Sequence, residues 1–482
     1  MPESAIRPRS STGSDSLRLW ANLVLVHLGV LIVGTAWWFG GQSVGARLGL
    51  LVWGSLGIPL FFAAWGAQRA QGGPRLKPWR YLWPLVVFDI LVLISCINPS
   101  TRVILHEGES MFVHTDPRWP WLPSSARPDL SLRELWQFNA IVISAFNAFF
   151  VLSRRRWMRR LLAILAGNAL LLSVFGTFQK LGGADGLWFG LVKTPQPYFF
   201  STFVYHNSWG AFTVLNVTIC LGLLFYSLRR GGHRDFWHSP VPLGGVAIAF
   251  IAATAPLSGS RSTTVLMLLL LLLATAQFLA YAIRSRRAHH ESIVLPVVGI
   301  VLAFALTVGG AVYLSYGVVA KRAELTARQI ERIRNEDTLN SRLVLYRDTW
   351  EMASRKPVFG WGLETYGDVF RIFNTQRAVE LKIGQPYYRE AHNDWFQSLA
   401  EVGFVGTFAL ICLGLAPLWG MRQGTSESHL PRHLLTGCGV VLAYAWVEFP
   451  FANPAVMMLF WTCLYVAAAY ARAEEPRSLP VT

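Results

Sequence analysis

Charged residues are scarce in this sequence. Asp, Glu, Lys and Arg make up 15% of its 482 residues, whereas soluble domains average roughly 25%. Apolar residues make up 53%, and apolar runs near the ~20 residues that cross a bilayer recur along the whole chain. The shortage of charge therefore excludes an ordinary soluble domain and predicts an all-α polytopic membrane protein.

The apolar runs predict about twelve transmembrane helices. We expect nine of them within 17–315 and three within 396–471, separated by a loop domain over 316–395, with a disordered tail over 1–16 and a second tail over 472–482. The predicted spans lie near residues 18–38, 46–67, 81–98, 135–153, 160–179, 208–228, 241–258, 263–283, 292–315, 396–419, 434–450 and 454–471.

The net charge of +16 is distributed in a way that argues against nucleic acid as a partner. Basic clusters such as 154–160 and 284–287 recur on alternate sides of the spans, while the opposite loops, such as 39–45 and 259–262, are nearly free of Lys and Arg. Cytoplasmic loops of membrane proteins carry such an excess of positive charge. The pattern predicts that both termini are cytoplasmic and that 316–395 faces outward.

Several chemical signatures are missing. The sequence has no Asp-x-Asp, no Gly-rich phosphate loop with a Lys and no cluster of His and Cys ligands. These absences argue against a soluble-type nucleotide-sugar transferase or an ATPase, and we expect neither cofactor nor metal.

His106-Glu107-Gly108-Glu109 offers donors for a divalent metal, although a solvated loop is the simpler interpretation. The five cysteines show no paired spacing, which predicts small buried side chains.

One polar segment, which we call the polar island, interrupts the apolar chain over 316–395. It holds 13 of the 43 Lys and Arg residues and 11 of the 27 Asp and Glu residues. Charge pairs at i, i+3 and i, i+4 predict a helix over 321–334. A second helix is predicted over 341–354, capped by Asn340, with a turn at Gly360-Trp361-Gly362. Most of this charge is the solvated face of helices.

His392, at the end of the polar island, is the first candidate for chemistry. Asn393 or Asp394 can cap the following helix, which places His392 beside the positive end of the helix dipole and disfavours the imidazolium. A neutral imidazole can act as a general base on a hydroxyl. The alternative is an interfacial histidine that only binds backbone. Tyr388 and Asn393, on either side, are candidate substrate contacts.

Arginines supply the next candidates. Arg261 lies in a short outward turn, Ser258 to Ser262, between two apolar spans, where an ionisable group is expensive and usually faces a cavity or partner. Its guanidinium can bind phosphate through two hydrogen bonds, or it can simply extend to the interface. Arg342 and Arg347 lie on the second helix of the polar island, where a solvated face is the alternative. His206 and Asn207, at the outer end of a span, are further candidates or a helix cap.

In order and context, these motifs resemble the bacterial O-antigen ligase/polymerase superfamily. A Ser-Gly-Ser-Arg turn ending at Arg261 is followed by a large loop with Ser341-Arg342-Leu343 and Pro357 to Gly362. His392 and Gly403 then match a His-x10-Gly pattern. The resemblance covers about residues 200–410. The Arg-x3-Leu spacing of some ligases is not met at Arg261, because Val265 is the fourth residue on.

The resemblance implies a glycosyltransferase of the bacterial inner membrane. It would move a glycan from a polyprenyl diphosphate carrier to a hydroxyl at the periplasmic face, without metal or nucleotide. Arg261 and Arg342 would contact the diphosphate, with Arg347 as a second choice, and His392 would activate the hydroxyl. The acceptor could be a growing polysaccharide, a lipid A core or, in a protein O-oligosaccharyltransferase, a protein. A lipid-linked glycan flippase or transporter and a non-catalytic assembly scaffold are the competing interpretations.

Overall fold

The computed structural model describes residues 11–70, 77–106, 109–194, 198–230, 238–336, 341–375, 388–419, 421 and 429–473. The regular secondary structure of the described chain is helical apart from one hairpin, β1 (Thr101–His106) with β2 (Glu109–His114). An all-α polytopic membrane protein is therefore confirmed. The helices are α1 (Ser11–Trp37), α2 (Val44–Ser55), α3 (Gly57–Ala70), α4 (Trp79–Ile97), α5 (Pro128–Val151), α6 (Arg155–Leu181), α7 (His206–Arg230), α8 (Val241–Leu257), α9 (Arg261–Ala288), α10 (Val294–Glu336), α11 (Ser341–Arg355), α12 (Tyr366–Phe373), α13 (Asp394–Leu415), α14 (His429–Tyr444) and α15 (Pro454–Arg472), with short 3-10 turns η1 (Phe39–Gly41) and η4 (Pro450–Ala452).

Each of the twelve predicted spans overlaps one or two of these helices. Within the described residues, ten helical stretches are long and apolar enough to cross a membrane, and α2 with α3 forms one of them. The other two predicted spans correspond to α8 and α14, of 17 and 16 residues. Apolar composition alone was sufficient to locate these elements.

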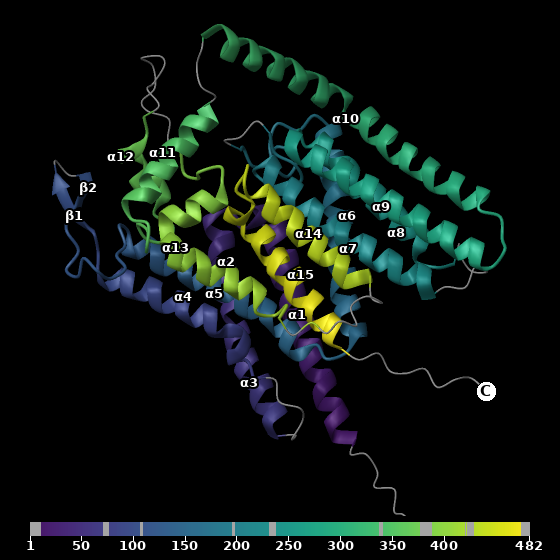
Figure 1. Cartoon of the computed structure of the whole chain (residues 1–482), viewed down its shortest axis with the longest axis horizontal. Helices are drawn as coiled ribbons and strands as arrows, with labels where there is room; N and C mark the ends of the chain where they lie inside the picture. The colour runs from purple at the N-terminus through teal and green to yellow at the C-terminus, as the bar shows by residue number, and fades with distance from the viewer. Residues whose placement is uncertain are drawn as a thin grey trace, which may run out of the picture.

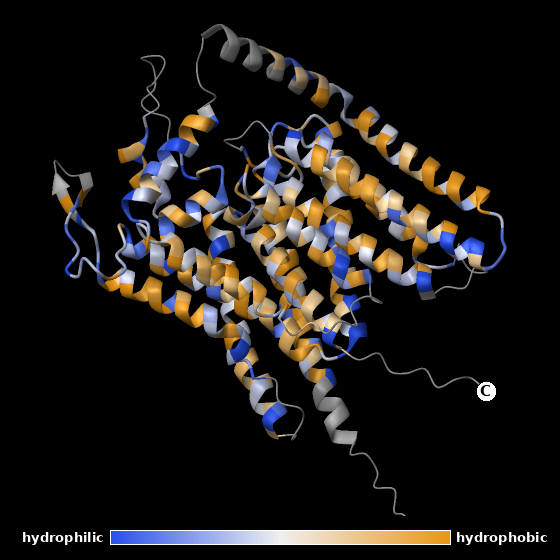
Figure 2. Cartoon of the chain, viewed as in Figure 1, coloured by the Kyte–Doolittle hydropathy of each residue, from blue (hydrophilic) through white to orange (hydrophobic). Residues whose placement is uncertain are grey.

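The centre of the bundle is formed by α5, α7 and α15. Within their most apolar windows, 78%, 78% and 89% of the residues are buried, as expected for helices that are apolar on every face. In Figure 1, α10 lies along the outer edge of the bundle, and none of the residues in its apolar window is buried. Figure 2 shows apolar residues over the bundle helices and polar residues gathered around α11 and α12.

The described part of the polar island contains α11 and α12, besides the end of α10 and the first residues of α13. The predicted helix over 321–334 is not separate, because α10 continues without a break from Val294 to Glu336. The predicted second helix is confirmed as α11, although its proposed cap, Asn340, lies outside the described residues. α11 and α12 pack on α13 around a small core of their own, which includes Leu345, Met352, Tyr366, Phe370 and Ala400.

α13 is sharply bent at Gly403. There φ is +63° and ψ −170°, and the Ser398 and Thr407 hydroxyls, nine residues apart, are joined by a hydrogen bond of 2.8 Å. In a straight helix these residues would be about 13 Å apart along the axis. α13 is therefore two limbs, 394–402 and 404–415, that face each other.

The loop 357–362 binds the backbone groups that the bend releases. The amides of Phe404 and Val405 donate to the carbonyls of Pro357 and Val358 at 2.8 and 3.1 Å. In return, the amides of Trp361 and Gly362 donate to the carbonyls of Ala400 and Glu401 at 2.9 and 2.8 Å. Buried backbone groups need such partners. The predicted turn at 360–362 therefore packs against the bend of α13 and binds its free backbone groups.

Gly403→Ala tests this interlock. A Cβ at Gly403 would lie 2.3 Å from the Val358 carbonyl oxygen, and a positive φ adds strain of ~1–3 kcal/mol for a non-glycine residue. We expect a clear fall in the melting temperature of the purified protein in detergent. The matched control is Gly414→Ala in the same helix, whose Cβ would meet only Leu464 at 3.9 Å. Equal melting temperatures for the two variants would contradict the interlock.

Candidate active site

A buried carboxylate, Glu448, brings together residues from separate parts of the chain. It lies between α14 and η4, and its side chain is 2% exposed. Arg342 of α11 donates from Nη2 to Glu448 Oε1 at 2.6 Å and from Nη1 to the Val447 carbonyl at 3.2 Å. His392 Nδ1 lies 3.6 Å from Glu448 Oε2. Two of the predicted catalytic residues therefore meet on one side chain that was not predicted.

Tyr205 extends this cluster to the start of α7. Its hydroxyl donates to Glu448 Oε2 at 3.2 Å and accepts from Asn207 Nδ2 at 2.8 Å. Asn207 Oδ1 in turn accepts from the Ser260 hydroxyl at 2.5 Å. Burial, followed by the charge of Glu448, raises the pKa of Tyr205, so its hydroxyl stays protonated and can donate. A chain of hydrogen bonds thus connects Glu448 to the turn that precedes Arg261.

Arg261 is the first residue of α9, and its neighbours on both sides are attached to the cluster. Ser260 binds Asn207, and the Ser262 hydroxyl lies 3.3 Å from the hydroxyl of Tyr444, at the end of α14. Gly259, with φ of +81°, makes the turn into the helix possible. The side chain of Arg261 is exposed. The starts of α7, α9 and α13 therefore gather around Glu448.

The backbone of His392 adopts a conformation that is rare for residues other than glycine, with φ of +52°. Three bonds hold this region. The Tyr346 hydroxyl donates to the His392 carbonyl at 2.9 Å, the Ala391 amide donates to Gln397 at 3.0 Å, and Asn393 caps α13 by accepting from the Phe396 amide at 3.0 Å. Strained residues persist only where their surroundings over-determine them, and they concentrate at functional sites.

The imidazole of His392 is oriented by its two neighbours. Its ring meets the ring of Phe449 edge to face at 4.6 Å between centroids, and its Nδ1 faces Glu448. A proton on Nδ1 would point toward the carboxylate, which leaves Nε2 as the basic nitrogen. Burial acts to raise the pKa of Glu448, but His392 and Arg342 outweigh it and hold that pKa below its usual range. Glu448 is therefore an anion at neutral pH.

The other predicted site residues have different surroundings. Arg347 donates to Asp348 at 3.0 and 3.1 Å and to Thr375, so it belongs to a second cluster on α11. His206 Nδ1 lies 3.1 Å from the Tyr198 carbonyl oxygen. The ring of Tyr388 packs edge to face on Phe370, in the core of the polar island. The loop of the His106–Glu109 motif joins β1 to β2, and residues 107 and 108 lie outside the described part of the chain.

Glu448 and Tyr346 were not predicted from the sequence, and Tyr205 was noted only as the residue before the candidates His206 and Asn207. Tyr205 has no distinctive local signature, because aromatic residues at span ends are common, and Tyr346 is a single tyrosine within α11 of the polar island. Glu448 did have one: it is an acidic residue inside a run that was interpreted as a span over 434–450. An ionisable residue in such a run is a functional candidate.

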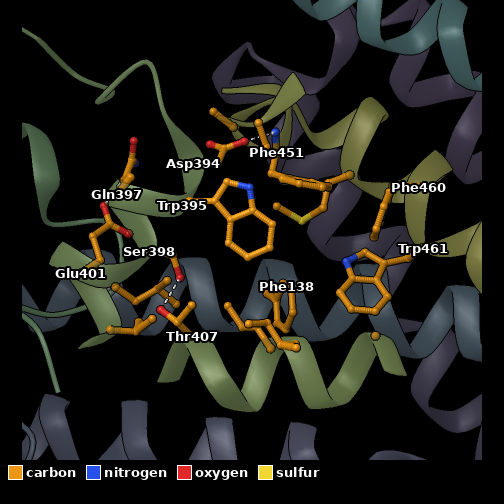
Figure 3. Close-up of a pocket in the computed structure, with 18 of the residues that line it drawn as sticks. Phe138, Asp394, Trp395, Gln397, Ser398, Glu401, Thr407, Phe451, Phe460 and Trp461 are labelled. Carbon is orange, nitrogen blue, oxygen red and sulfur yellow. Dashed lines mark hydrogen bonds between the residues drawn. The ribbon is translucent and has the colours of Figure 1, made fainter. Parts of the chain in front are cut away.

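A cavity of ≈ 340 Å³ lies inside the bend of α13. Glu390 and Asp394, two residues before and after His392, both line it. Figure 3 shows Gln397 and Glu401 on one side of Trp395 and the rings of Phe460 and Trp461 on the other, with Phe138 below. The cavity has one polar end, formed by Arg47, Glu134, Glu364, Glu390, Gln397 and Glu401, and otherwise largely apolar walls.

Comparison with known proteins shows which family this sequence resembles. Residues 245–411 match the family model described as O-antigen ligase. This stretch of the chain is similar to O-antigen ligases. It includes Arg261, Arg342, His392 and Gly403, whereas Glu448 and Tyr205 lie outside it. Over 405 residues, 83% of each chain, the sequence is also 25% identical to the exopolysaccharide production protein ExoQ of Rhizobium meliloti. The protein is therefore a multi-pass membrane protein that resembles polysaccharide-related ligases and polymerases at the level of the family.

The carboxyl of Glu390, at the polar end of the cavity, predicts a pH dependence of stability. Burial and then the nearby Glu364 raise its pKa to about 7. The folded state therefore holds this proton more tightly than the unfolded chain, and stability falls as the pH rises from about 4.5 through about 7. Glu390→Gln, which mimics the protonated form, should flatten this part of the curve of melting temperature against pH. Glu351→Gln, on the exposed face of α11, is the control and should leave the curve unchanged, whereas an unaltered slope in Glu390→Gln would exclude the explanation.

Proposed function

We propose that the protein is a glycosyltransferase that moves a glycan from a polyprenyl diphosphate carrier to an acceptor hydroxyl. The observation that carries this proposal is the convergence of Arg342, His392 and Tyr205 on the buried carboxylate of Glu448, next to the turn that bears Arg261. In this proposal the reaction takes place at the periplasmic face of the bacterial inner membrane, and both termini are cytoplasmic. The similarity to O-antigen ligases supports lipid-linked glycans and membrane lipid as partners.

His392 serves as the general base in this proposal. Its Nδ1 faces an anionic carboxylate, so Nε2 can accept a proton while Glu448 stabilises the imidazolium that forms. The 3.6 Å between Nδ1 and Glu448 is slightly longer than a hydrogen bond. Such contacts commonly tighten only when substrate is bound. Tyr346, which binds the His392 carbonyl, acts as a positioning residue.

The arginines and helix starts favour binding of the diphosphate. Arg342 is held by Glu448 and the Val447 carbonyl, yet 44% of its side chain remains exposed to a ligand. Arg261 lies at the first turn of α9, where free amides and the helix dipole also favour an anion. As the diphosphate leaves, its negative charge increases, and these groups can stabilise the transition state more than the ground state.

The reaction then follows as one displacement. The acceptor oxygen loses its proton to His392 Nε2 and forms a bond to the anomeric carbon of the donor sugar. The bond between that carbon and the diphosphate oxygen breaks, and its electron pair leaves with the polyprenyl diphosphate. The configuration at the anomeric carbon is inverted. Because the diphosphate is already an activated leaving group, no nucleotide is required.

We further propose a growing polysaccharide as the acceptor. The printed name of the relative, an exopolysaccharide production protein, favours a polymer over a lipid A core or a protein hydroxyl. The arrangement of the charged groups also favours an enzyme over a flippase or transporter. Transporters place their charged sites near the membrane midplane, whereas Arg261, His392 and Glu448 lie at or just beyond helix ends.

His392 is tested with two variants. His392→Ala should reduce glycan transfer from a polyprenyl diphosphate donor by ~10²–10⁴-fold, which is the usual contribution of a general base. His392→Asn should lose as much activity while keeping the melting temperature, because Asn also tolerates a positive φ. Transfer at the wild-type rate by either well-folded variant would remove His392 as the base.

The arginines are tested by changing them to lysine. Arg261→Lys and Arg342→Lys should each lower transfer by roughly tenfold or more, because lysine cannot make the paired hydrogen bonds of a guanidinium. Arg347→Lys is the matched control, since Arg347 binds Asp348 and Thr375 instead, and it should stay within about twofold of wild type. The assignment of Arg342 fails if Arg347→Lys proves to be the more damaging change.

A further inference from the structure

The cavity inside the bend of α13 has no role in the proposed transfer. Its volume of ≈ 340 Å³ lies within the range of ligand pockets, roughly 300–1,000 Å³. Both limbs of α13 line it, with Gln397 and Glu401 on the first limb and Leu410, Ile411 and Gly414 on the second. The bend at Gly403 therefore creates a chamber with a wall on each side.

One end of this chamber is polar and highly ordered. Glu401 is 6% exposed and accepts from the amides of Glu364 and Tyr366 at 2.9 and 3.1 Å. Gln397 donates to Glu390 at 2.9 Å and lies 3.3 Å from Glu401. Arg47 reaches in from α2, 3.6 Å from Glu134 and 3.8 Å from Glu364. These groups are held in place by the fold and are not a loose acidic surface.

The charge of the lining restricts what can bind. Among the described residues of the lining, the charged groups are Arg47 and five carboxyls: Glu134, Glu364, Glu390, Asp394 and Glu401. A phosphate or diphosphate head would find a single guanidinium among five carboxyl groups, and that guanidinium already lies beside Glu134 and Glu364. The diphosphate is therefore directed to the arginine side of His392 and away from this chamber.

The rest of the lining restricts the ligand further. Away from the polar end, the walls are rings and aliphatic chains such as Phe138, Phe460, Trp461 and Leu464, which fit a hydrocarbon chain. At the polar end, carboxylates accept hydrogen bonds, while Arg47 and Gln397 can donate them. Sugar hydroxyls can use both kinds of partner, whereas an ammonium group can use only the acceptors. Trp395 adds an aromatic surface beside them (Figure 3).

We propose that this chamber is a second binding site, for a neutral glycolipid whose hydrocarbon chain lies along the apolar walls and whose sugar head lies among the carboxylates. The site is separate from the diphosphate contacts and does not depend on the transfer reaction. Its polar end includes Glu390, two residues before His392 in the sequence. The ligand is identified by this chemistry: one apolar chain and an uncharged head rich in hydroxyls.

Photolabelling of the full chain in a zwitterionic detergent tests the site. The probe is decyl glucoside with a diazirine in its chain, compared with decyl phosphate and decylammonium bearing the same group. The glucoside should label α13 or α15 next to the chamber, at least about tenfold more than the phosphate, because the single guanidinium of the lining already lies beside two carboxyls and offers an anionic head little attraction. Equal labelling by decyl phosphate, stronger labelling by decylammonium, or labelling only elsewhere would overturn the proposal.

Two glycine variants make the test specific. Gly414 lines the chamber, and a Cβ there meets nothing closer than 3.9 Å, so Gly414→Leu fills the space without disturbing the helix. It should lower labelling about tenfold, because the leucine side chain would displace roughly two methylene groups of the probe's hydrocarbon chain from the chamber. Gly439→Leu, on an open surface of α14, should label as wild type does. Persistence of labelling in Gly414→Leu, or an equal loss in both variants, would argue against the chamber.

A third variant separates this inference from the proposed transfer. His392→Asn should lose transfer and keep its labelling by decyl glucoside, since His392 does not line the chamber. Failure of labelling in a protein that still transfers glycan overturns only the second site. Normal labelling together with normal transfer in His392→Asn overturns only the proposed base.

Discussion

The bend in α13 is the constraint on which the rest of the outer half depends. A helix can reverse within a few residues only if the backbone groups it releases find other partners. The loop 357–362 provides them with four backbone hydrogen bonds, and close contact is possible because Gly360 and Gly403 have no side chain at the interface. This interlock fixes the first limb of α13, and with it Asn393 and the strained backbone of His392.

A buried anion organises the candidate active site. Glu448 is almost inaccessible to solvent, and an isolated carboxylate there would be strongly disfavoured. It is stabilised because Arg342, Tyr205 and His392 come to it from three different elements. The same contacts orient the guanidinium and the imidazole. The charge that stabilises this arrangement is thus also the group that would support a base and a diphosphate site.

The first turn of α13 separates two chemically opposite environments. Around His392 lie the arginines and the starts of three helices, which favour an anion. Around Glu390 and Glu401, at the end of an apolar chamber, lie several carboxyl groups and one guanidinium that is already beside two of them, which is a poor site for an anion. Two ligands that differ in head-group charge can therefore bind close together without competing, because electrostatics directs each to its own side.

The sequence by itself determined the membrane class, the positions of the membrane helices, the helix of Arg342 and the candidate residues Arg261, Arg342 and His392. Composition and local periodicity are enough for these, since a span or a capped helix is specified by neighbouring residues. Only the tertiary structure decided that α10 continues into the polar island, that α13 is bent, that Arg342 and not Arg347 approaches His392, and that Glu448 joins them. These features depend on contacts between residues as far apart as Tyr205 and Glu448. The local sequence pattern cannot predict such contacts, because they form only when distant helices pack together.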